Sequence, residues 1–200
     1  MNRVDLAERV RAALRRHERR QLEVVAAVPA AVLVPLFLDG DTVHVLYTKR
    51  TETVPHHQGQ IAFPGGQVDP DDPSAVVAAT REAHEEIGLR PEHADILGAL
   101  DDIHTIRSNF VITPVVALIP HPYAFTPNPP EVAEIFAVPL PTLQDPAARR
   151  EELWEFERIR VPVPTIQYRG HVIWGATERI SRNLVEILHK AIPYGETRTG

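Results

Sequence analysis

Three glutamates near the middle of the chain have the spacing of a shared binding site. Glu82, Glu85 and Glu86 stand at positions i, i+3 and i+4 of a segment with helical character, and residues so spaced lie on one helical face. Three carboxylates on one face repel one another unless a cation lies over them. Hard divalent cations such as Mg²⁺ prefer oxygen ligands of this kind. The spacing therefore indicates a site for a divalent cation.

A solvated acidic helix end is the alternative interpretation of these residues. Glutamate-rich helices are common, and three glutamates alone favour that interpretation. However, Glu85 and Glu86 stand close to the expected C-terminus of the helix, where the helix dipole disfavours negative charge. Helix stability does not explain their position, so binding is the better hypothesis.

The helix that carries the glutamates is expected to cover residues 73–87. Asp72 is its expected N-cap, a proline fits its first position, and Gly88 is the expected C′ residue that ends it. Before the helix, Gly65 and Gly66 predict a tight turn at which the backbone can approach a ligand closely.

The remaining elements alternate between apolar runs and turn residues. The expected helices cover residues 4–20 and 176–191. The expected strands cover residues 30–38 and 42–50, joined by an Asp-Gly turn, then 94–103, 111–119 and a strand that starts near Glu131. A further hairpin is expected of 151–161 with 171–174, with Arg169-Gly170 near its turn. A mixed sheet between helices, in an α/β fold, fits this order.

Composition excludes several classes of protein. The length of 200 residues suits one domain with a good core. A net charge of −6 argues against a broad nucleic-acid surface, and the absence of cysteine excludes disulfides and thiolate chemistry. Neither a signal peptide nor an apolar run that could span a bilayer is evident. We therefore expect a cytoplasmic enzyme with a small-molecule substrate and neither a nucleic-acid nor a membrane partner.

Cleavage of a diphosphate is a reaction that the carboxylate site can support. The leaving oxygen gains negative charge and the non-bridging oxygens repel a nucleophile, and cations relieve both problems. Glu82 and Glu86, one helical turn apart, can bind the same ion. Glu85 can bind a second ion or act on the attacking water, and Arg81 can pair with Glu85 at i+4. The candidate metal ligands are therefore Glu82, Glu85 and Glu86, and the candidate catalytic residues are Arg81, Glu82 and Glu85.

Residues 63–89 resemble the Nudix box, the motif of the Nudix hydrolase superfamily. The motif is a Gly, five residues, an acidic residue, seven residues, and Arg-Glu-aliphatic-x-Glu-Glu-x-Gly-aliphatic. Its second half is complete from Arg81 to Leu89, and its first half has Gly66 and Asp72, with one extra residue before Arg81. The resemblance implies the α/β/α Nudix sandwich and Mg²⁺- or Mn²⁺-dependent hydrolysis of a nucleoside diphosphate linked to another group. We expect residues 1–200 to form a single Nudix hydrolase domain with a helical extension at 1–25.

The segment before the box is similar to the signature of the coenzyme A pyrophosphatase branch of this superfamily. The matching residues are Leu46, Thr48, Arg50, His57, Gly59, Gln60, Phe63, Pro64, Gly65 and Gly66. The extra residue in the box is usual in that branch, whereas Pro55 replaces an expected arginine. The resemblance implies cleavage of coenzyme A to 3′,5′-ADP and 4′-phosphopantetheine. The candidate substrate-binding residues are Arg50, His57, Gln60, Gly65 and Gly66.

Other polar residues are weaker candidates. Glu131 and Glu134 follow a proline-rich loop and are candidates for a remote general base. Asp101, Asp102 and His104 cluster at the end of a strand. Near the last helix, Trp174 is expected in the core and Thr177 as a cap.

Two other functions stay open on sequence alone. The enzyme can act instead on another nucleoside diphosphate derivative, such as ADP-ribose, a dinucleoside polyphosphate or NADH. A nucleotide-sensing Nudix domain that does not cleave its ligand is the alternative outside the enzymes, although such domains commonly lose box glutamates and all three are present here. The sequence also leaves open whether the protein forms a homodimer.

Overall fold

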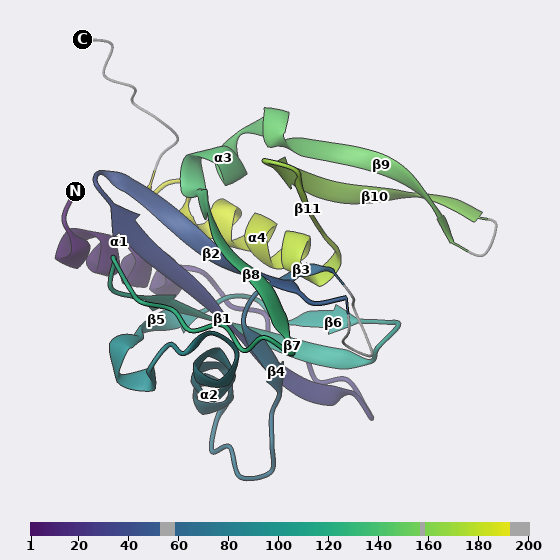
Figure 1. Ribbon diagram of the computed structural model, residues 1–200, viewed down its shortest axis with the longest axis horizontal. Helices are drawn as coiled ribbons and strands as arrows, with labels where there is room; N and C mark the ends of the chain where they lie inside the picture. The colour runs from purple at the N-terminus through teal and green to yellow at the C-terminus, as the bar shows by residue number, and fades with distance from the viewer. Residues whose placement is uncertain (53–58, 157–158, 193–200) are drawn as a thin grey trace.

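The computed structural model describes residues 1–52, 59–156 and 159–192, and Figure 1 shows the arrangement of its elements. Pro55, His56 and His57 lie outside the described residues. The helices are α1 (Arg3–Arg16), α2 (Ala75–Ile87), α3 (Leu140–Gln144) and α4 (Gly175–Leu188), with short 3-10 turns η1 (Pro91–His93) and η2 (Pro146–Ala148). The strands are β1 (Val28–Asp39), β2 (Thr42–Arg50), β3 (Ile61–Ala62), β4 (Gly65–Gln67), β5 (Asp95–Ala99), β6 (Ile103–Thr105), β7 (Phe110–Leu118), β8 (Val132–Pro139), β9 (Arg149–Phe156), β10 (Ile159–Tyr168) and β11 (His171–Trp174).

The central sheet is mixed, as the sequence predicts. Strands β1 and β7 pair in parallel, from Val28 opposite Phe110 to Leu36 opposite Leu118. The other pairings are antiparallel, including the predicted hairpin of β1 with β2. Most of β1 is buried on both faces, as expected for a central strand that pairs in parallel and is covered on both sides.

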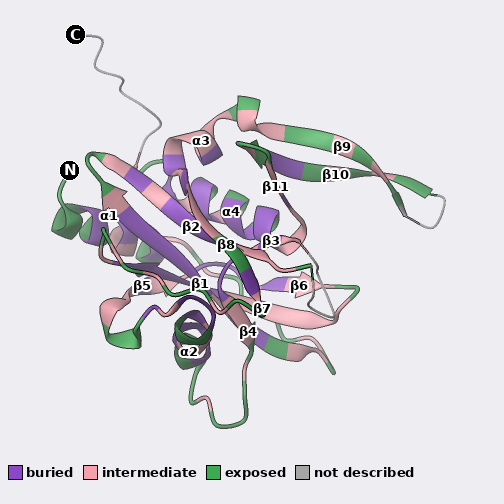
Figure 2. Cartoon of the chain, in the orientation of Figure 1, coloured by how far each residue is buried: buried purple, intermediate pink, exposed green. Residues whose placement is uncertain are grey.

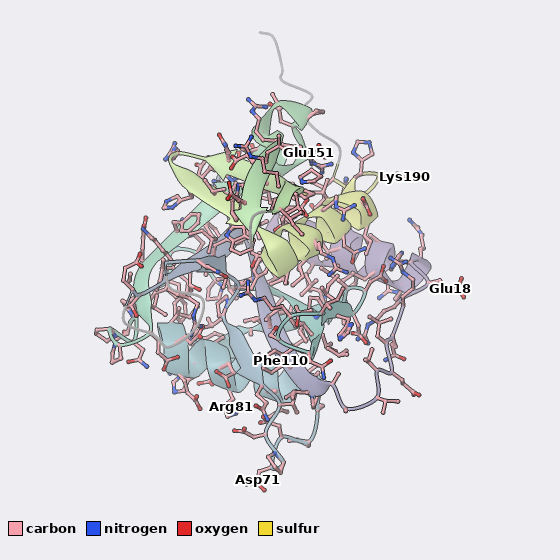
Figure 3. All side chains as sticks on the ribbon, turned by 90° about the vertical axis from the view of Figure 1, so that its right-hand side faces the viewer. Glu18, Asp71, Arg81, Phe110, Glu151 and Lys190 are labelled. Atoms are coloured by element: carbon pink, nitrogen blue, oxygen red, sulfur yellow. The ribbon has the colours of Figure 1, made fainter. Side chains whose placement is uncertain are left out.

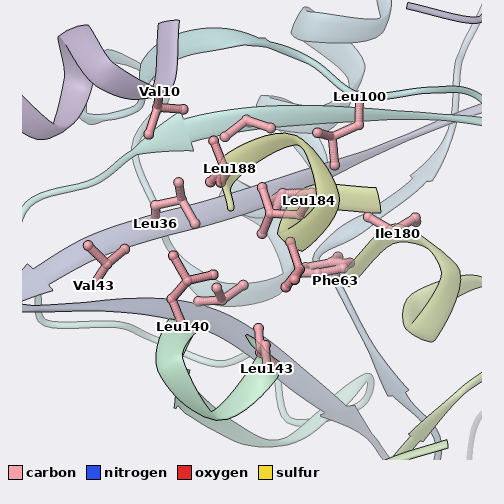
Figure 4. Packing of buried hydrophobic residues seen from close by; sticks show 14 of the residues in the cluster. Val10, Leu36, Val43, Phe63, Leu100, Leu140, Leu143, Ile180, Leu184 and Leu188 are labelled. Atoms are coloured by element: carbon pink, nitrogen blue, oxygen red, sulfur yellow. The ribbon is translucent and has the colours of Figure 1, made fainter. Parts of the chain in front are cut away.

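Helices cover both faces of this sheet, so the predicted α/β/α sandwich is confirmed. One apolar cluster joins the sheet to α1, α3 and α4, and includes Leu36, Leu140 and Leu184 (Figure 4). The other joins the opposite face to α2, through alanines such as Ala79 and Ala83. The buried stripes of the sheet and helices meet between these layers (Figure 2). No helix among the described residues is long and apolar enough to cross a membrane.

The caps of α2 differ in part from the prediction. Gly88 ends the helix in the left-handed conformation, with φ of 68°, as predicted. The predicted N-cap is wrong: Ser74 caps the helix and accepts a hydrogen bond from the backbone N–H of Val77. Asp72 is unavailable as a cap because its carboxylate binds Arg81.

The N-terminal helix packs on the face of the sheet that lies opposite α2. It ends at Arg16 instead of continuing to residue 20. The next residues run along the sheet, where Asp101 accepts hydrogen bonds from Arg20 and contacts His17, and Asp102 accepts one from Arg19. These aspartates therefore hold the N-terminal segment in place and do not join the glutamates of α2. The extent of a single domain over residues 1–200 stays a prediction.

A second, three-stranded sheet follows α3, in the order β11-β10-β9. The predicted turn near Arg169-Gly170 is confirmed, because it joins β10 to β11 in a hairpin. The predicted pairing of 151–161 with 171–174 is wrong, because β9 and β11 pair with opposite sides of β10. Thr177 does not cap α4 but donates a hydrogen bond to the carbonyl oxygen of Ile61. Trp174 is only partly buried and lies against Trp154, with 4.8 Å between ring centroids.

Candidate active site

Three segments that are distant in sequence meet beside the glutamates of α2. The backbone N–H of Gly65 in β4 donates a hydrogen bond of 3.3 Å to Glu86. The guanidinium of Arg50, the last residue of β2, lies 3.7 Å from the same carboxylate. Glu131, which precedes β8, lies close enough to influence the protonation of both Glu82 and Glu86. The structure therefore brings Arg50, Gly65 and Glu131 to the helix face that the glutamate spacing predicts.

The double glycine forms a short strand, and the predicted turn is wrong. In β4, Gly65 pairs with Val32 and Gly66 with Ala31 of β1. A Cβ on Gly65 would collide with the carbonyl oxygen of Ala31, and a Cβ on Gly66 would lie 2.5 to 2.8 Å from the carboxylate atoms of Glu82. Glycine is needed here because the backbone packs directly against a neighbouring strand and a carboxylate.

Arg81 joins the helix to the loop that precedes it. Its guanidinium binds both carboxylate oxygens of Asp72, at 3.2 and 2.9 Å, and donates to the carbonyl oxygen of Gln67. It also contacts Glu82 at 2.9 Å and Glu85 at 3.3 Å, which confirms the predicted i+4 pair. The hydrogen bonds to Asp72 raise the pKa of Arg81 and lower the pKa of Asp72. We interpret Arg81 as a positioning residue, because its donors are used by the protein. Figure 3 labels Arg81 on the side of α2.

The three glutamates differ in their exposure to solvent. The side chain of Glu86 is 5% exposed and that of Glu82 is 18% exposed, whereas that of Glu85 is 53% exposed. The structure thus places Glu82 and Glu86 against the glycine strand and Glu85 toward solvent beside Arg81. This arrangement is the one expected if Glu82 and Glu86 bind the same ion.

A loop across the end of α2 carries Glu131 into the site. The backbone N–H of Asn128 donates to the carbonyl oxygen of Glu86 at 2.8 Å, and its side-chain amide donates to Glu131 at 3.0 Å. Glu134, the other candidate base, instead contacts His171 at 3.4 Å. The role of Asn128 was not predicted, since no local pattern shows that this loop covers the helix end.

Burial controls the charge of the two inner glutamates. Desolvation raises the pKa of Glu86 to about 8, while Arg50 and the N–H of Gly65 oppose this shift and the neighbouring glutamates add to it. Desolvation also raises the pKa of Glu82, opposed by Arg81. Two carboxylates in this position favour a bound positive charge, because it stabilises their ionised forms.

The predicted substrate-binding residues fall in two groups. Arg50, Gly65 and Gly66 line the glutamate site, and the Nε of Arg50 is buried without a hydrogen-bond partner among the described residues. Gln60 is held nearby, because its carbonyl oxygen accepts a hydrogen bond from the backbone N–H of Arg50. His57 lies outside the described residues.

The donor set fits a hard divalent cation. In the part of the chain that the structure describes, no three His, Asp or Glu side chains are drawn together as a closed ligand set. Mg²⁺ in enzymes is usually held by one or two carboxylates, with waters and substrate phosphates in the other positions. Glu82 and Glu86 provide two largely buried carboxylates. The absence of a side chain at Gly66 leaves room for the carboxylate of Glu82. These residues are therefore the candidate ligands.

Stability without metal is expected to fall as the pH rises. Glu86 holds its proton to a pH of about 8 in the folded protein, whereas its ordinary pKa is 4.5. The folded state binds more protons than the unfolded state between these values, so the free energy of unfolding decreases from about pH 5 to pH 8, by up to about 4 kcal/mol. Chemical unfolding in EDTA across this range measures the effect. Glu86→Gln should flatten the profile and Glu85→Gln should not, and an unchanged slope in Glu86→Gln would contradict the prediction.

Comparisons with known proteins identify the family of the chain. The family model described as NUDIX domain matches residues 27–158. An uncharacterized Nudix hydrolase, NudL of Pectobacterium atrosepticum, is 38% identical over 170 residues, covering 84% of this chain and 82% of the relative. NudL of Photorhabdus laumondii is 34% identical over 164 residues, covering 78% and 83%.

A solved structure supports the fold over most of the chain. The MutT/nudix family protein from Enterococcus faecalis has a TM-score of 0.51 and 14% identity, and the match covers 94% of this chain and 80% of that protein. At this identity the likeness concerns the fold alone. The chain belongs to the Nudix family, whose hydrolases act on nucleoside diphosphate derivatives and generally use divalent metal cations.

Proposed function

We propose that this Nudix hydrolase cleaves the diphosphate bond of coenzyme A, giving 3′,5′-ADP and 4′-phosphopantetheine. The observation that supports this substrate is the position of Arg50. Arg50 belongs to the signature that resembles the coenzyme A pyrophosphatase branch, and its guanidinium lies 3.7 Å from Glu86 of the Nudix box. A residue of the substrate signature thus adjoins the carboxylates at which a diphosphate would bind.

The side chains have distinct roles in this proposal. Glu82 and Glu86 would hold the divalent cation, which supplies charge neutralisation and a more acidic bound water. The Arg50 guanidinium would contact a diphosphate oxygen, since its planar fork suits bidentate binding of phosphate. Arg81 fixes Glu82 and joins the helix to Asp72.

Glu131 is the better candidate for the general base. The side-chain amide of Asn128 orients the carboxylate of Glu131, and this carboxylate is close enough to raise the pKa of Glu86. Glu134 is engaged with His171, and Glu85 points to solvent beside Arg81. A carboxylate that is held by an amide and faces other glutamates can accept a proton from an attacking water.

A panel of substrates tests the proposed specificity. We expect kcat/KM for coenzyme A to exceed that for ADP-ribose, NADH and dinucleoside polyphosphates by about tenfold or more, because binding of the correct substrate's polar groups gives this scale of discrimination. Mass spectrometry of the products identifies the bond that is cleaved. Faster cleavage of ADP-ribose would overturn the substrate assignment. Binding without cleavage of any of them would favour the nucleotide-sensing alternative.

A further inference from the structure

One face of the three-stranded sheet carries Arg150 and both tryptophans of the chain. The register places Arg150 of β9, Thr165 of β10 and Trp174 of β11 in a single cross-strand row. Side chains in such a row point to the same face of a sheet. Trp154 is on the same face, four residues after Arg150, and so is Gln167, two residues after Thr165. We call this surface the tryptophan face. The sheet that carries it projects beyond α4 in Figure 1.

A basic hollow lies at one end of the tryptophan face. It has a volume of about 370 Å³, and Arg150, Arg169 and His171 line it together with Gln167. Two carboxylates border it, because Glu152 accepts a hydrogen bond from Gln167 and Glu134 lies 3.4 Å from His171. The guanidinium groups of Arg150 and Arg169 are the positive charges that would attract an anionic ligand.

Local contacts orient the side chains of the hollow. One guanidinium nitrogen of Arg150 donates to the carbonyl oxygens of Ala147 and Arg149, at 2.6 and 3.1 Å. The guanidinium of Arg169 lies over the ring of Tyr168, 5.2 Å from its centroid. The ring of His171 stacks on Phe136 at 4.0 Å and its Nε2 lies 3.4 Å from Glu134, so we assign it no part in holding an anion.

The turn at the hollow is itself unusual. Arg169 and Gly170 connect β10 to β11 with φ values of 47° and 86°. A two-residue turn of this kind prefers asparagine or glycine at its first position, because other side chains are less stable in the left-handed region. Local turn preference therefore does not explain an arginine at this position.

The aromatic part of the face is next to the hollow. Trp154 and Trp174 meet edge to face with 4.8 Å between ring centroids, and both remain partly exposed. Glu152 accepts hydrogen bonds from the indole N–H of Trp154, at 2.8 Å, and from the amide of Gln167, at 2.6 Å. Both carboxylate oxygens of Glu152 therefore accept a hydrogen bond, and Glu152 fixes the side chains of Trp154 and Gln167 between the aromatic rings and the hollow.

We propose that the tryptophan face binds a nucleoside phosphate, with the phosphate in the arginine hollow and the base against the tryptophans. Two strand spacings separate Arg150 from Trp174, which is roughly 10 Å. That separation suits a phosphate and the purine ring of the same nucleotide. Arginine is suited to bidentate phosphate binding, and aromatic rings stack on bases of any kind. The site shares no residue with the glutamate site and does not depend on the identity of the hydrolysed substrate.

Tryptophan fluorescence provides the test, because Trp154 and Trp174 are the two tryptophans of the chain. The full-length protein in EDTA is titrated with 3′,5′-ADP, with excitation at the red edge of tryptophan absorption. We expect saturable quenching, weakened roughly tenfold in Kd by Arg150→Gln. Arg169→Asn should weaken binding similarly while retaining or raising Tm, because asparagine suits the turn. Arg160→Gln is the matched control, since the register puts Arg160 opposite Glu155 on the other face.

The outcomes of these measurements answer two questions: whether the site exists, and whether its ligand is the substrate or a separate nucleotide. No saturable quenching, or equal affinity in Arg150→Gln, Arg169→Asn and the control, would overturn the proposal. If binding is lost and KM for coenzyme A rises in the same variants with kcat unchanged, the face holds the nucleotide end of the substrate. If binding is lost and KM is unchanged, the ligand is a separate nucleotide. A failure of coenzyme A hydrolysis in the wild type would refute the proposed function and leave the fluorescence result intact.

Discussion

Replacing Glu86 with glutamine is expected to reduce kcat/KM of the metal-dependent hydrolysis by about 10²- to 10⁴-fold, the range found when a positioned catalytic group is lost. Glutamine has nearly the same shape but cannot supply an anionic ligand oxygen. The carboxylate of Glu86 is 5% exposed and contacts Arg50 and the N–H of Gly65, so no bulk solvent group can readily replace it. The fold should persist, because burial already favours the neutral form of this side chain.

Glu85→Gln is the matched control for this substitution. It makes the same change of charge on the same helix, one residue away. Because the Glu85 side chain is 53% exposed and its contact is with Arg81, we expect a loss of less than about tenfold. Steady-state rates over a titration of Mg²⁺ and Mn²⁺, with thermal unfolding as the check on folding, compare the two variants. Equal losses in both would refute the assignment of Glu86 as a ligand, and a larger loss in Glu85→Gln would exchange their roles.

Periodicity and turn residues allow much of the fold to be predicted. The hairpin of β1 with β2 follows from two apolar runs on either side of an Asp-Gly turn. Gly88 ends α2 because glycine adopts a φ of 68° without the steric cost that a side chain brings. The N-cap of α2 could not be predicted in the same way. Asp72 is a good cap by residue type, but Arg81 nine residues later binds both its oxygens, and that competition exists only in the folded chain.

In the candidate site too, local features could be predicted from the sequence and long-range contacts could not. The helical face of Glu82 and Glu86 is a local property and follows from their spacing. Which of the glutamates is buried depends on β4, since Gly65 and Gly66 pack against α2 while Glu85 lies beyond the strand. Long-range contacts of this kind leave no periodic signal in the sequence.

The three-stranded sheet was harder to predict because its strands have weak alternation. Prolines interrupt β10, which pairs with β9 over residues 159–166 and with β11 over residues 165–168. Trp174 was expected in the core from its size and type, whereas its ring lies on the outer tryptophan face beside Trp154. Large aromatic residues are often only partly buried, so size alone does not decide between core and binding surface.

Gly66→Ala is expected to reduce kcat/KM by about 100-fold, the scale of a displacement of roughly 1 Å in a catalytic group. The new Cβ would lie 2.5 to 2.8 Å from the carboxylate atoms of Glu82, so that carboxylate must move. The backbone of Gly66 is not in the left-handed region, and alanine therefore brings little strain of its own. Tm should change little, since the displaced group is a side chain at the edge of the site.

A double-mutant cycle with Glu82→Ala identifies the cause of this loss. If Gly66→Ala acts by displacing the Glu82 carboxylate, it should have almost no further effect once that carboxylate is absent, and the coupling between the two substitutions should be nearly as large as the single effect. Additive losses would mean that the Cβ disturbs β4 or its pairing with β1 instead. The cycle therefore distinguishes a glycine that makes space for a candidate metal ligand from a glycine that is needed for sheet packing. The neighbouring Gly65 is the contrasting case, because a Cβ there would collide with the backbone of Ala31. We expect a large loss of Tm in Gly65→Ala.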